Sequence, residues 1–447
     1  MKLYRVCKKH YKIKNSRQGL VLIIQGLALA FFALAFLLLF PVTFSYAESI
    51  QDVNNKISQK NIEISKLEQE IQIYQKGLNE LSKQKNSLNG SLKELDLTRK
   101  KLITDIAVTQ NKIDETNLKI QILNSRIDTK ENDIASATEA VMLGIKQTNE
   151  FELDNILYTV LSENNFTLIW NDIDNIVTIR EKIREKIIEL KKIKGELENT
   201  RKETISAKKE LTTLRSRLAD QKKIVEQNTT EKKKLLTQTK NNEVNYQKLL
   251  RDRLVKKLAF EKELRDYESR LQFILDPSKL PLSGVLSWPF DSIYVTQSFG
   301  RTEAGRRLYA SGTHNGTDFR ASVGTPVKAM AGGTVFGIGD TDIQCYGVSF
   351  GRFIFIKYDN GLASTFGHLS LIKVNTGDKI SRGDVVGYTG NTGYSTGPHL
   401  HVSVYAREAV DLKTLPSKSC PGRVLTQPIA PINAYLDPMY YLPALLS

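Results

Sequence analysis

The stretch ISKLEQEIQIYQKGLNEL, residues 64–81, decides the fold of the first part of the chain. Its apolar side chains recur alternately three and four positions apart, at Ile64, Leu67, Ile71, Tyr74, Leu78 and Leu81. The same pattern runs from residue 53 to residue 134, where 18 of 24 such positions are apolar. A repeat of about 3.5 residues lines one face of a helix for packing against a partner helix. The sequence therefore predicts a coiled-coil arm over residues 48–134.

A second apolar seam begins near Ile176 and holds to Leu218, with ten of thirteen positions apolar. It weakens toward Phe260, where Asn, Lys and Thr enter the seam, and we place the second arm at residues 176–275. Two arms of similar length joined by a compact segment favour an antiparallel hairpin that folds back on itself. A dimer between two chains is the alternative.

The joining segment, residues 135–175, breaks the repeat and gains bulky apolar residues such as Phe151, Phe166 and Trp170. It contains no proline, so short amphipathic helices are expected. Either a packed tip that closes the hairpin or a docking or regulatory element fits this pattern. An apolar helix far from any other core needs a partner for its face.

Proline and glycine gather toward the C-terminus. Of 12 prolines, eleven lie from Pro277 onward, and 21 of 27 glycines follow residue 283. Both residues punctuate turns, and proline breaks helices. We therefore expect a linker over residues 276–287 and an all-β domain over residues 288–447. The expected strands are apolar runs between glycine turns, at residues 294–299, 334–338, 352–358, 384–388 and 400–405.

The turn sequence Asp359-Asn360-Gly361 between two such runs predicts a β-hairpin. The fold class is thus α+β and multidomain: a long antiparallel coiled-coil hairpin followed by an all-β domain.

Residues 1–47 have the features of an export leader. Seven Lys and Arg residues and no acidic residue lie in residues 1–18, and residues 19–47 carry no charge. Residues 20–40 are almost wholly apolar, and Ser45-Tyr46-Ala47 has the form of a cleavage site. Such a run also spans a bilayer core of roughly 30 Å, so an uncleaved N-terminal membrane anchor is the alternative. Either way, the remainder is expected outside the cytoplasm, in the cell envelope, secreted, periplasmic or anchored.

The formal net charge of +15 falls to +8 without the leader, because 57 basic residues then face 49 acidic ones. The lysines at residues 232–234 have no interleaved aromatic residues, which is typical of a solvated helix face. We therefore expect no nucleic-acid partner. In an oxidising compartment Cys345 and Cys420 are predicted to form an intramolecular disulfide, and two free thiols are the alternative.

Four of the five histidines fall in the β domain, at positions 314, 368, 399 and 401. On a strand, His399 and His401 share one face. His314 and Asp318 would stand roughly 13 Å apart if extended, so the chain must bend at Asn315-Gly316 for both to bind one ion.

His314, Asp318 and His401 then provide two nitrogens and one carboxylate for one Zn²⁺ ion, a catalytic donor set that leaves a fourth position for water. Such a water has a pKa of about 7. His368 and His399 are candidate catalytic residues that take a proton, donate one or stabilise an oxyanion. The sequence does not assign these roles to one histidine or the other.

Three motifs now resemble those of the LytM/lysostaphin-type zinc metallopeptidases, metallopeptidase family twenty-three, over roughly residues 285–410. They are His314-x-Gly-x-Asp318, Phe366-Gly-His368-Leu369 and Thr392-Gly-Tyr-Ser-Thr-Gly-Pro-His399-Leu-His401. The resemblance implies zinc on His314, Asp318 and His401, catalysis assisted by His368 and His399, and cleavage of peptide bonds in bacterial peptidoglycan. It also implies a β core of mixed two-sheet or barrel-sandwich form, a duplicated hybrid motif.

The whole layout resembles the murein hydrolase activator EnvC family. In that family the zinc ligands are often missing, the protein activates separate amidases, the coiled coil engages an FtsEX-type transporter complex, and a helical arm restrains the LytM domain. Here the ligands are intact, which favours a working peptidase, and a noncatalytic activator of amidases is the alternative. Phe366 replaces the Tyr usual before the Gly-His-Leu motif. We also expect the coiled coil to restrain activity.

Overall fold

A computed structural model describes residues 50–81, 87–153, 166–271, 273–301 and 312–445. Contacts divide the chain into two compact units, residues 1–53 and 54–447, and the contacts and the site described below lie in the second. The predicted leader, residues 1–47, lies outside the described residues. Among the helices that are described, none is both long and apolar enough to cross a membrane.

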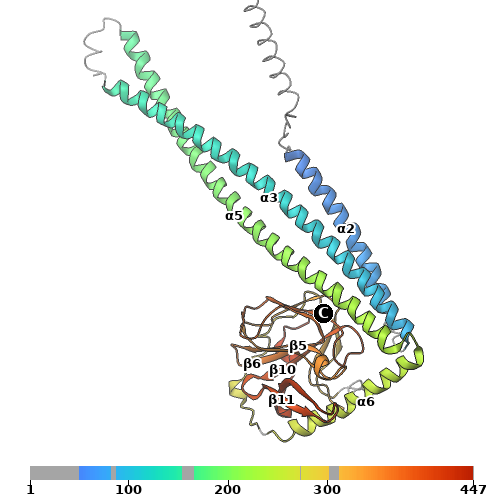
Figure 1. Cartoon of the computed structure of the whole chain (residues 1–447). Helices are drawn as coiled ribbons and strands as arrows, with labels where there is room; N and C mark the ends of the chain where they lie inside the picture. Colours follow the sequence, from blue (N-terminus) through green and yellow to red (C-terminus); the bar gives the residue numbers. More distant parts are fainter. Residues whose placement is uncertain (1–49, 82–86, 154–165, 272, 302–311, 446–447) are drawn as a thin grey trace, which may run out of the picture. The chain divides into compact units, whose positions relative to one another are not determined.

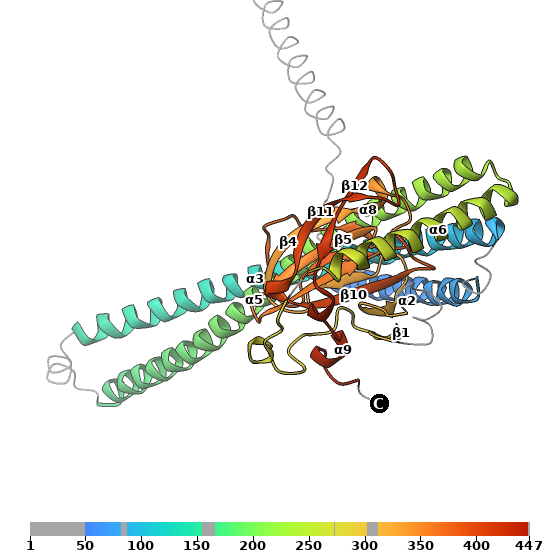
Figure 2. The same ribbon diagram turned by 90° about the horizontal axis from the view of Figure 1, so that it is seen from below.

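The described residues of the N-terminal part form four long helices: α2 (Ile50–Leu81), α3 (Leu88–Leu153), α5 (Phe166–Thr239) and α6 (Glu243–Glu268). Helices α3 and α5 run side by side in opposite directions, as Figures 1 and 2 both show. Cross-helix ion pairs join Lys130 to Glu196, and Arg201 to Glu131 at 2.7 Å. The predicted antiparallel hairpin is present, formed by these two helices.

The prediction of one unbroken first arm is wrong. Helix α2 ends at Leu81, and α3 begins at Leu88 and returns along α2, so that the Lys112 ammonium lies 3.2 Å from the Glu68 carboxylate. Leu81 and Leu88 are seven positions apart, so the heptad register is the same before and after the turn. The apolar pattern therefore does not reveal the turn. A hydrogen bond from the Gly90 N–H to the Ser87 hydroxyl caps the new helix.

The second arm is also two helices. Lys240 and Asn241 have φ values of 50° and 53°, a left-handed conformation that ends α5. The side chain of Asn242 then accepts hydrogen bonds from the N–H groups of Val244 and Asn245, which caps α6. The weakening of the seam toward Phe260 reflects this change of partner, because α6 packs against the β domain.

The expected short helices of residues 135–175 are not found in the part of that segment the structure describes. Helix α3 continues unbroken to Leu153, and α5 begins at Phe166. Residues 154–165 lie outside the described residues. In its described parts the segment contains no proline, which is consistent with the long helices reaching into it from both sides.

The C-terminal part is a β domain. In the described residues its strands form an eight-stranded sheet, in which the order is β1-β2-β10-β6-β5-β4-β8 with β13 paired to β10, a three-stranded sheet β3-β9-β7 and the pair β11-β12. The strands are β1 (Val295–Gln297), β2 (Thr317–Arg320), β3 (Pro326–Lys328), β4 (Gly333–Asp340), β5 (Arg352–Tyr358), β6 (Leu362–Gly367), β7 (Leu369–Ile372), β8 (Lys379–Ile380), β9 (Val385–Thr389), β10 (His399–Ala406), β11 (Asp411–Ser417), β12 (Arg423–Ile429) and β13 (Tyr435–Leu436). Short helices α8 (Thr341–Gln344) and α9 (Pro438–Tyr441) complete it.

The predicted turn at residues 359–361 joins β5 to β6, which pair antiparallel. Gly361 there has a φ of 88°, a left-handed value that a residue without Cβ adopts at no steric cost. Cys345, after α8, and Cys420, between β11 and β12, form a disulfide.

Alternation along β10 orients the candidate site. Leu400, Val402 and Val404 are fully buried in the main apolar core. Because side chains alternate along a strand, His399 and His401 lie on the opposite face. The core thus holds one face of β10 rigidly while the other face presents imidazoles.

Candidate metal centre

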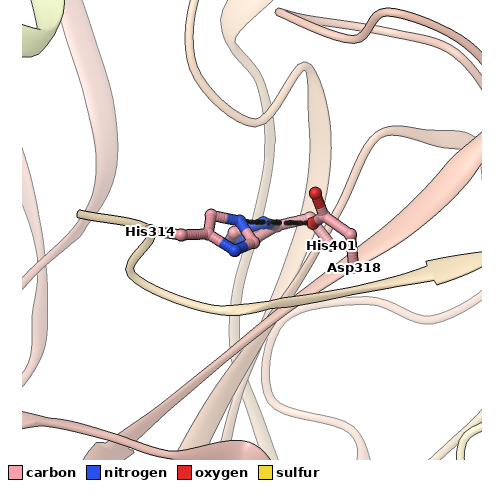
Figure 3. Close-up of side chains that lie close together, drawn as sticks. All are labelled: His314, Asp318 and His401. Atoms are coloured by element: carbon pink, nitrogen blue, oxygen red, sulfur yellow. Dashed lines mark hydrogen bonds and ion pairs between the residues drawn. The ribbon is translucent and has the colours of Figure 1, made fainter. Parts of the chain in front are cut away.

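Strand register brings two of the predicted ligands together. Strand β10 pairs antiparallel with β2, and His401 stands directly opposite Asp318. His314 precedes β2 and is held by two backbone hydrogen bonds with Gly300, of 2.8 and 3.0 Å. Figure 3 shows the three side chains pointing toward one another.

Gly316 makes the expected bend between His314 and Asp318 possible. A Cβ at this position would lie 2.5 Å from the Val402 carbonyl oxygen and 2.6 Å from His401 Nε2. Real side chains do not approach so closely, so the chain can pass beside His401 only with glycine here.

The three candidate ligand atoms form a compact triangle. His401 Nδ1 lies 2.9 Å from Asp318 Oδ1, His314 Nε2 lies 3.4 Å from the same oxygen, and the two nitrogens are 3.2 Å apart. Ligands about 2 Å from one tetrahedral ion are about 3.3 Å apart, so the spacing fits a single zinc ion. All three residues are buried.

Hydrogen bonds at the far side of each imidazole select the nitrogen that faces the site. His314 Nδ1 donates to the Ser298 carbonyl oxygen at 3.1 Å, which leaves Nε2 as the ligand atom. His401 Nε2 donates to the Ser403 hydroxyl at 2.9 Å, which leaves Nδ1. Such outer partners orient ligands and tune their basicity.

Sequence reasoning missed both serines. Ser403 stands two residues after His401 on the same face of β10, so strand periodicity offered a signal for it. Ser298 acts through its backbone, which no side-chain pattern reveals.

Electrostatics favour an ionised Asp318. Burial acts to raise the pKa of this carboxyl, but hydrogen bonds with His314 and His401 outweigh burial and hold its pKa well below the ordinary value. Burial is also the main cause that lowers the pKa of His401. A neutral imidazole and an ionised carboxylate are the forms that bind a metal ion.

The two candidate catalytic histidines lie beside this triangle. The ring centroid of His368 is 4.5 Å from that of His399 and 5.9 Å from that of His401. His368 Nδ1 donates to the Thr392 carbonyl oxygen at 2.8 Å, and His399 Nδ1 donates to that of Gly397 at 2.7 Å. Burial, followed by the neighbouring imidazoles, lowers the pKa of His368 well below its ordinary value.

One further element reaches the site. A cavity of about 200 Å³ is lined by His314, His368 and His401. Residues of α6 form part of its wall, namely Lys257, Phe260, Glu261, Leu264, Arg265 and Glu268. This contact was not predicted, because the residues of α6 lie within the predicted second arm.

Helix α6 is bound to the β domain by specific contacts. The Glu263 carboxylate accepts hydrogen bonds from the backbone N–H of Lys418 at 2.8 Å and of Ser419 at 3.2 Å. The Tyr435 hydroxyl donates to Glu268 at 2.6 Å. Phe260 packs in an apolar cluster next to the disulfide.

Two imidazoles and one carboxylate around an open position form the donor set of a catalytic zinc centre. Residues 312–412 match the model of Peptidase family M23. The β domain therefore contains a peptidase M23 domain, and the three candidate ligands lie within the matched stretch.

Known proteins show how far the similarity extends. The chain is 30% identical over 137 residues to an uncharacterized metalloprotease of Buchnera aphidicola, covering 30% of this chain and 35% of the relative. It is 42% identical over 94 residues to the peptidoglycan DD-endopeptidase ShyA of Vibrio cholerae, covering 21% of this chain and 20% of the relative. The chain thus spans about a third or less of the length of these relatives.

Among solved structures, the catalytic domain of lysostaphin from Staphylococcus simulans is 32% identical. The match covers 26% of this chain and 81% of that chain, with a TM-score of 0.23.

Proposed function

We propose that the chain is a zinc metalloendopeptidase of the cell envelope that cleaves peptide bonds of bacterial peptidoglycan during wall remodelling or division. The observation that carries the proposal is the triangle of His314 Nε2, Asp318 Oδ1 and His401 Nδ1. Similarity to a peptidoglycan DD-endopeptidase supports the substrate class. The export features of residues 1–47 support action outside the cytoplasm.

Zinc, when bound, supplies a Lewis acid that activates water and polarises the peptide carbonyl. The protein holds the ligands in place and provides proton transfer. Because His368 and His399 each use Nδ1 on a carbonyl oxygen, Nε2 is the nitrogen that can accept a proton from water or donate one to the leaving amine. The lowered pKa of His368 favours the neutral ring near pH 7, the form whose Nε2 accepts a hydrogen bond.

The direct test is a digest of purified peptidoglycan with the zinc-loaded β domain, residues 283–447, which has its own buried core. We expect new amine ends that depend on zinc and disappear in His401→Ala. Mass spectrometry of the fragments identifies the bond that is cut. No new amine ends from metal-loaded protein, or unchanged release by His401→Ala, would refute a peptidase.

We also propose that α6 restrains this site and that partners relieve the restraint through the helical hairpin. The support is that α6 forms a wall of the cavity that holds the candidate ligands. Candidate partners are an FtsEX-type membrane complex and cell wall amidases. Equal activity of the full exported chain and the isolated β domain would contradict the restraint.

The second candidate function is a noncatalytic activator that binds cell wall amidases. The long α3–α5 hairpin favours this activator function, because helices of this length are needed to extend to a distant partner and are not needed for catalysis. An activator would raise the activity of an added amidase even when His401→Ala has removed a metal ligand. A peptidase would lose its effect on the wall with that substitution.

A further inference from the structure

Helix α6 buries two charged residues at the cavity beside its apolar anchor Phe260, while other apolar residues of the helix are exposed. Lys257 is 1% exposed and Glu268 is 4% exposed, whereas Leu254 is 46% and Val255 is 66% exposed. Removing an ammonium from water costs free energy unless a partner compensates for it. The contact is therefore specific for charge rather than driven by apolar burial alone.

The β domain offers an aromatic ring to this ammonium. Lys257 Nζ lies 3.7 Å above the ring centroid of Tyr394 and 3.3 Å from the Glu261 carboxylate. Glu261 belongs to α6 itself, so it would leave together with the helix. Tyr394 stays, and it lines the same cavity as His314, His368 and His401.

The backbone around Tyr394 is held in place. The Tyr394 N–H donates to the Ser349 carbonyl oxygen at 2.9 Å, and the Gly393 N–H donates to the Asp342 carboxylate at 2.7 Å. The β domain thus fixes the backbone that carries the Tyr394 ring, and an aromatic ring face attracts a cation.

We propose that the ring of Tyr394 is a subsite for a primary amine of the substrate peptide, and that Lys257 of α6 fills this subsite in the structure. This inference rests on the proposed peptidase function. The stem peptides of peptidoglycan contain a diamino residue, so a free side-chain amine is available close to their peptide bonds. Helix and substrate then compete for one ring face.

Tyr346 provides a matched comparison. Lys234 Nζ lies 3.8 Å and the Arg253 guanidinium 4.5 Å from its ring centroid, so this ring also receives helix cations. Tyr346 is not among the described residues that line the cavity with the three histidines. Loss of the Tyr346 ring should loosen helix docking without changing which substrates are preferred.

The experiment uses the full zinc-loaded chain and two substrates: a cross-linked muropeptide dimer with a free side-chain amine, and the same dimer acetylated at that amine. The measured quantity is the ratio of their kcat/KM values. With Lys257→Gln, which empties the subsite, we expect the free amine to be preferred about 3- to 30-fold. Adding Tyr394→Leu should bring the ratio to about 1, whereas Tyr394→Phe and Tyr346→Leu should preserve it.

Lys256→Gln is the matched control on α6, because Lys256 is exposed and its substitution should leave the ratio at the wild-type value. A ratio near 1 in Lys257→Gln, or a preference that survives Tyr394→Leu, would overturn the subsite.

If neither dimer is cleaved, the proposed function fails, and fluorescence anisotropy of the labelled dimers with the same variants still tests the subsite. Preferential binding of the free amine that requires an aromatic residue at position 394 supports it, and equal binding refutes it.

Discussion

His401 and Asp318 stand opposite each other in the ladder between β10 and β2, with Nδ1 of the imidazole 2.9 Å from Oδ1 of the carboxylate. The two residues are 83 positions apart in the sequence. The sheet register therefore builds the metal centre, and groups that maintain this register or orient the two side chains should matter for metal binding.

Ser403→Ala should weaken zinc binding. The hydroxyl accepts a hydrogen bond from His401 Nε2 at 2.9 Å and thereby keeps Nδ1 directed at the site. Loss of such an outer partner typically lowers metal affinity about 10- to 100-fold. Competition with a chromophoric chelator measures the affinity. Ser364→Ala is the control, because that buried hydroxyl pairs with Tyr358 instead, and equal affinities of the two variants would contradict the role of Ser403.

Gly316→Ala should abolish metal binding with a smaller effect on the rest of the fold. The added Cβ would meet the Val402 carbonyl oxygen at 2.5 Å and His401 Nε2 at 2.6 Å, so β2 and His401 must separate. Zinc content per chain measures the outcome. Gly195→Ala in α5 is the control, because no atom lies within 4 Å of its added Cβ, and alanine should stabilise the helix by about 0.5–1 kcal/mol. Normal zinc content in Gly316→Ala would refute the close approach.

Release of α6 should raise peptidoglycan cleavage by the full chain. Phe260→Ala removes an apolar anchor of α6, and Glu263→Gln weakens its hydrogen bonds to Lys418 and Ser419. A core Phe→Ala change costs about 3–5 kcal/mol of packing, enough to shift a docked helix toward an open state. Release of amine ends measures the rate, and Lys256→Gln should leave it unchanged. A lower rate in a folded double variant would argue that α6 assists the site.

Docking of α6 should weaken as the pH rises. Burial raises the pKa of Glu268 to about 7, against the opposing effects of the Tyr435 hydrogen bond and Arg265. A carboxyl whose pKa is raised in the docked state contributes its full stability below its ordinary pKa of about 4.5, and the contribution is lost as the pH rises through about 7. The change is on the order of 3 kcal/mol.

Glu268→Gln cannot ionise and should flatten this pH dependence. Proteolytic sensitivity of α6 between pH 5 and 8 measures docking. An unchanged profile in Glu268→Gln would assign the pH dependence to another group.

The chemistry of the site was predictable because it depends on residue types. Four histidines gathered in one domain, with Asp318 four residues after His314, indicate a metal donor set. Ser403 lay within reach of the same reasoning. The carbonyl of Ser298 did not, because every residue has one and only the fold selects which of them meets His314.

The sequence by itself determined where helix and sheet form and which residues carry the chemistry, since periodicity, proline and glycine act locally along the chain. The tertiary structure alone decided how the helices pair. The heptad register is the same on both sides of the turn between Leu81 and Leu88. Locally, only Lys240, Asn241 and the Asn242 cap separate α6 from α5. The contact of Lys257 with Tyr394 likewise could not be predicted from the sequence. An apolar seam indicates that a helix face packs against a partner, but long-range packing determines which partner that is.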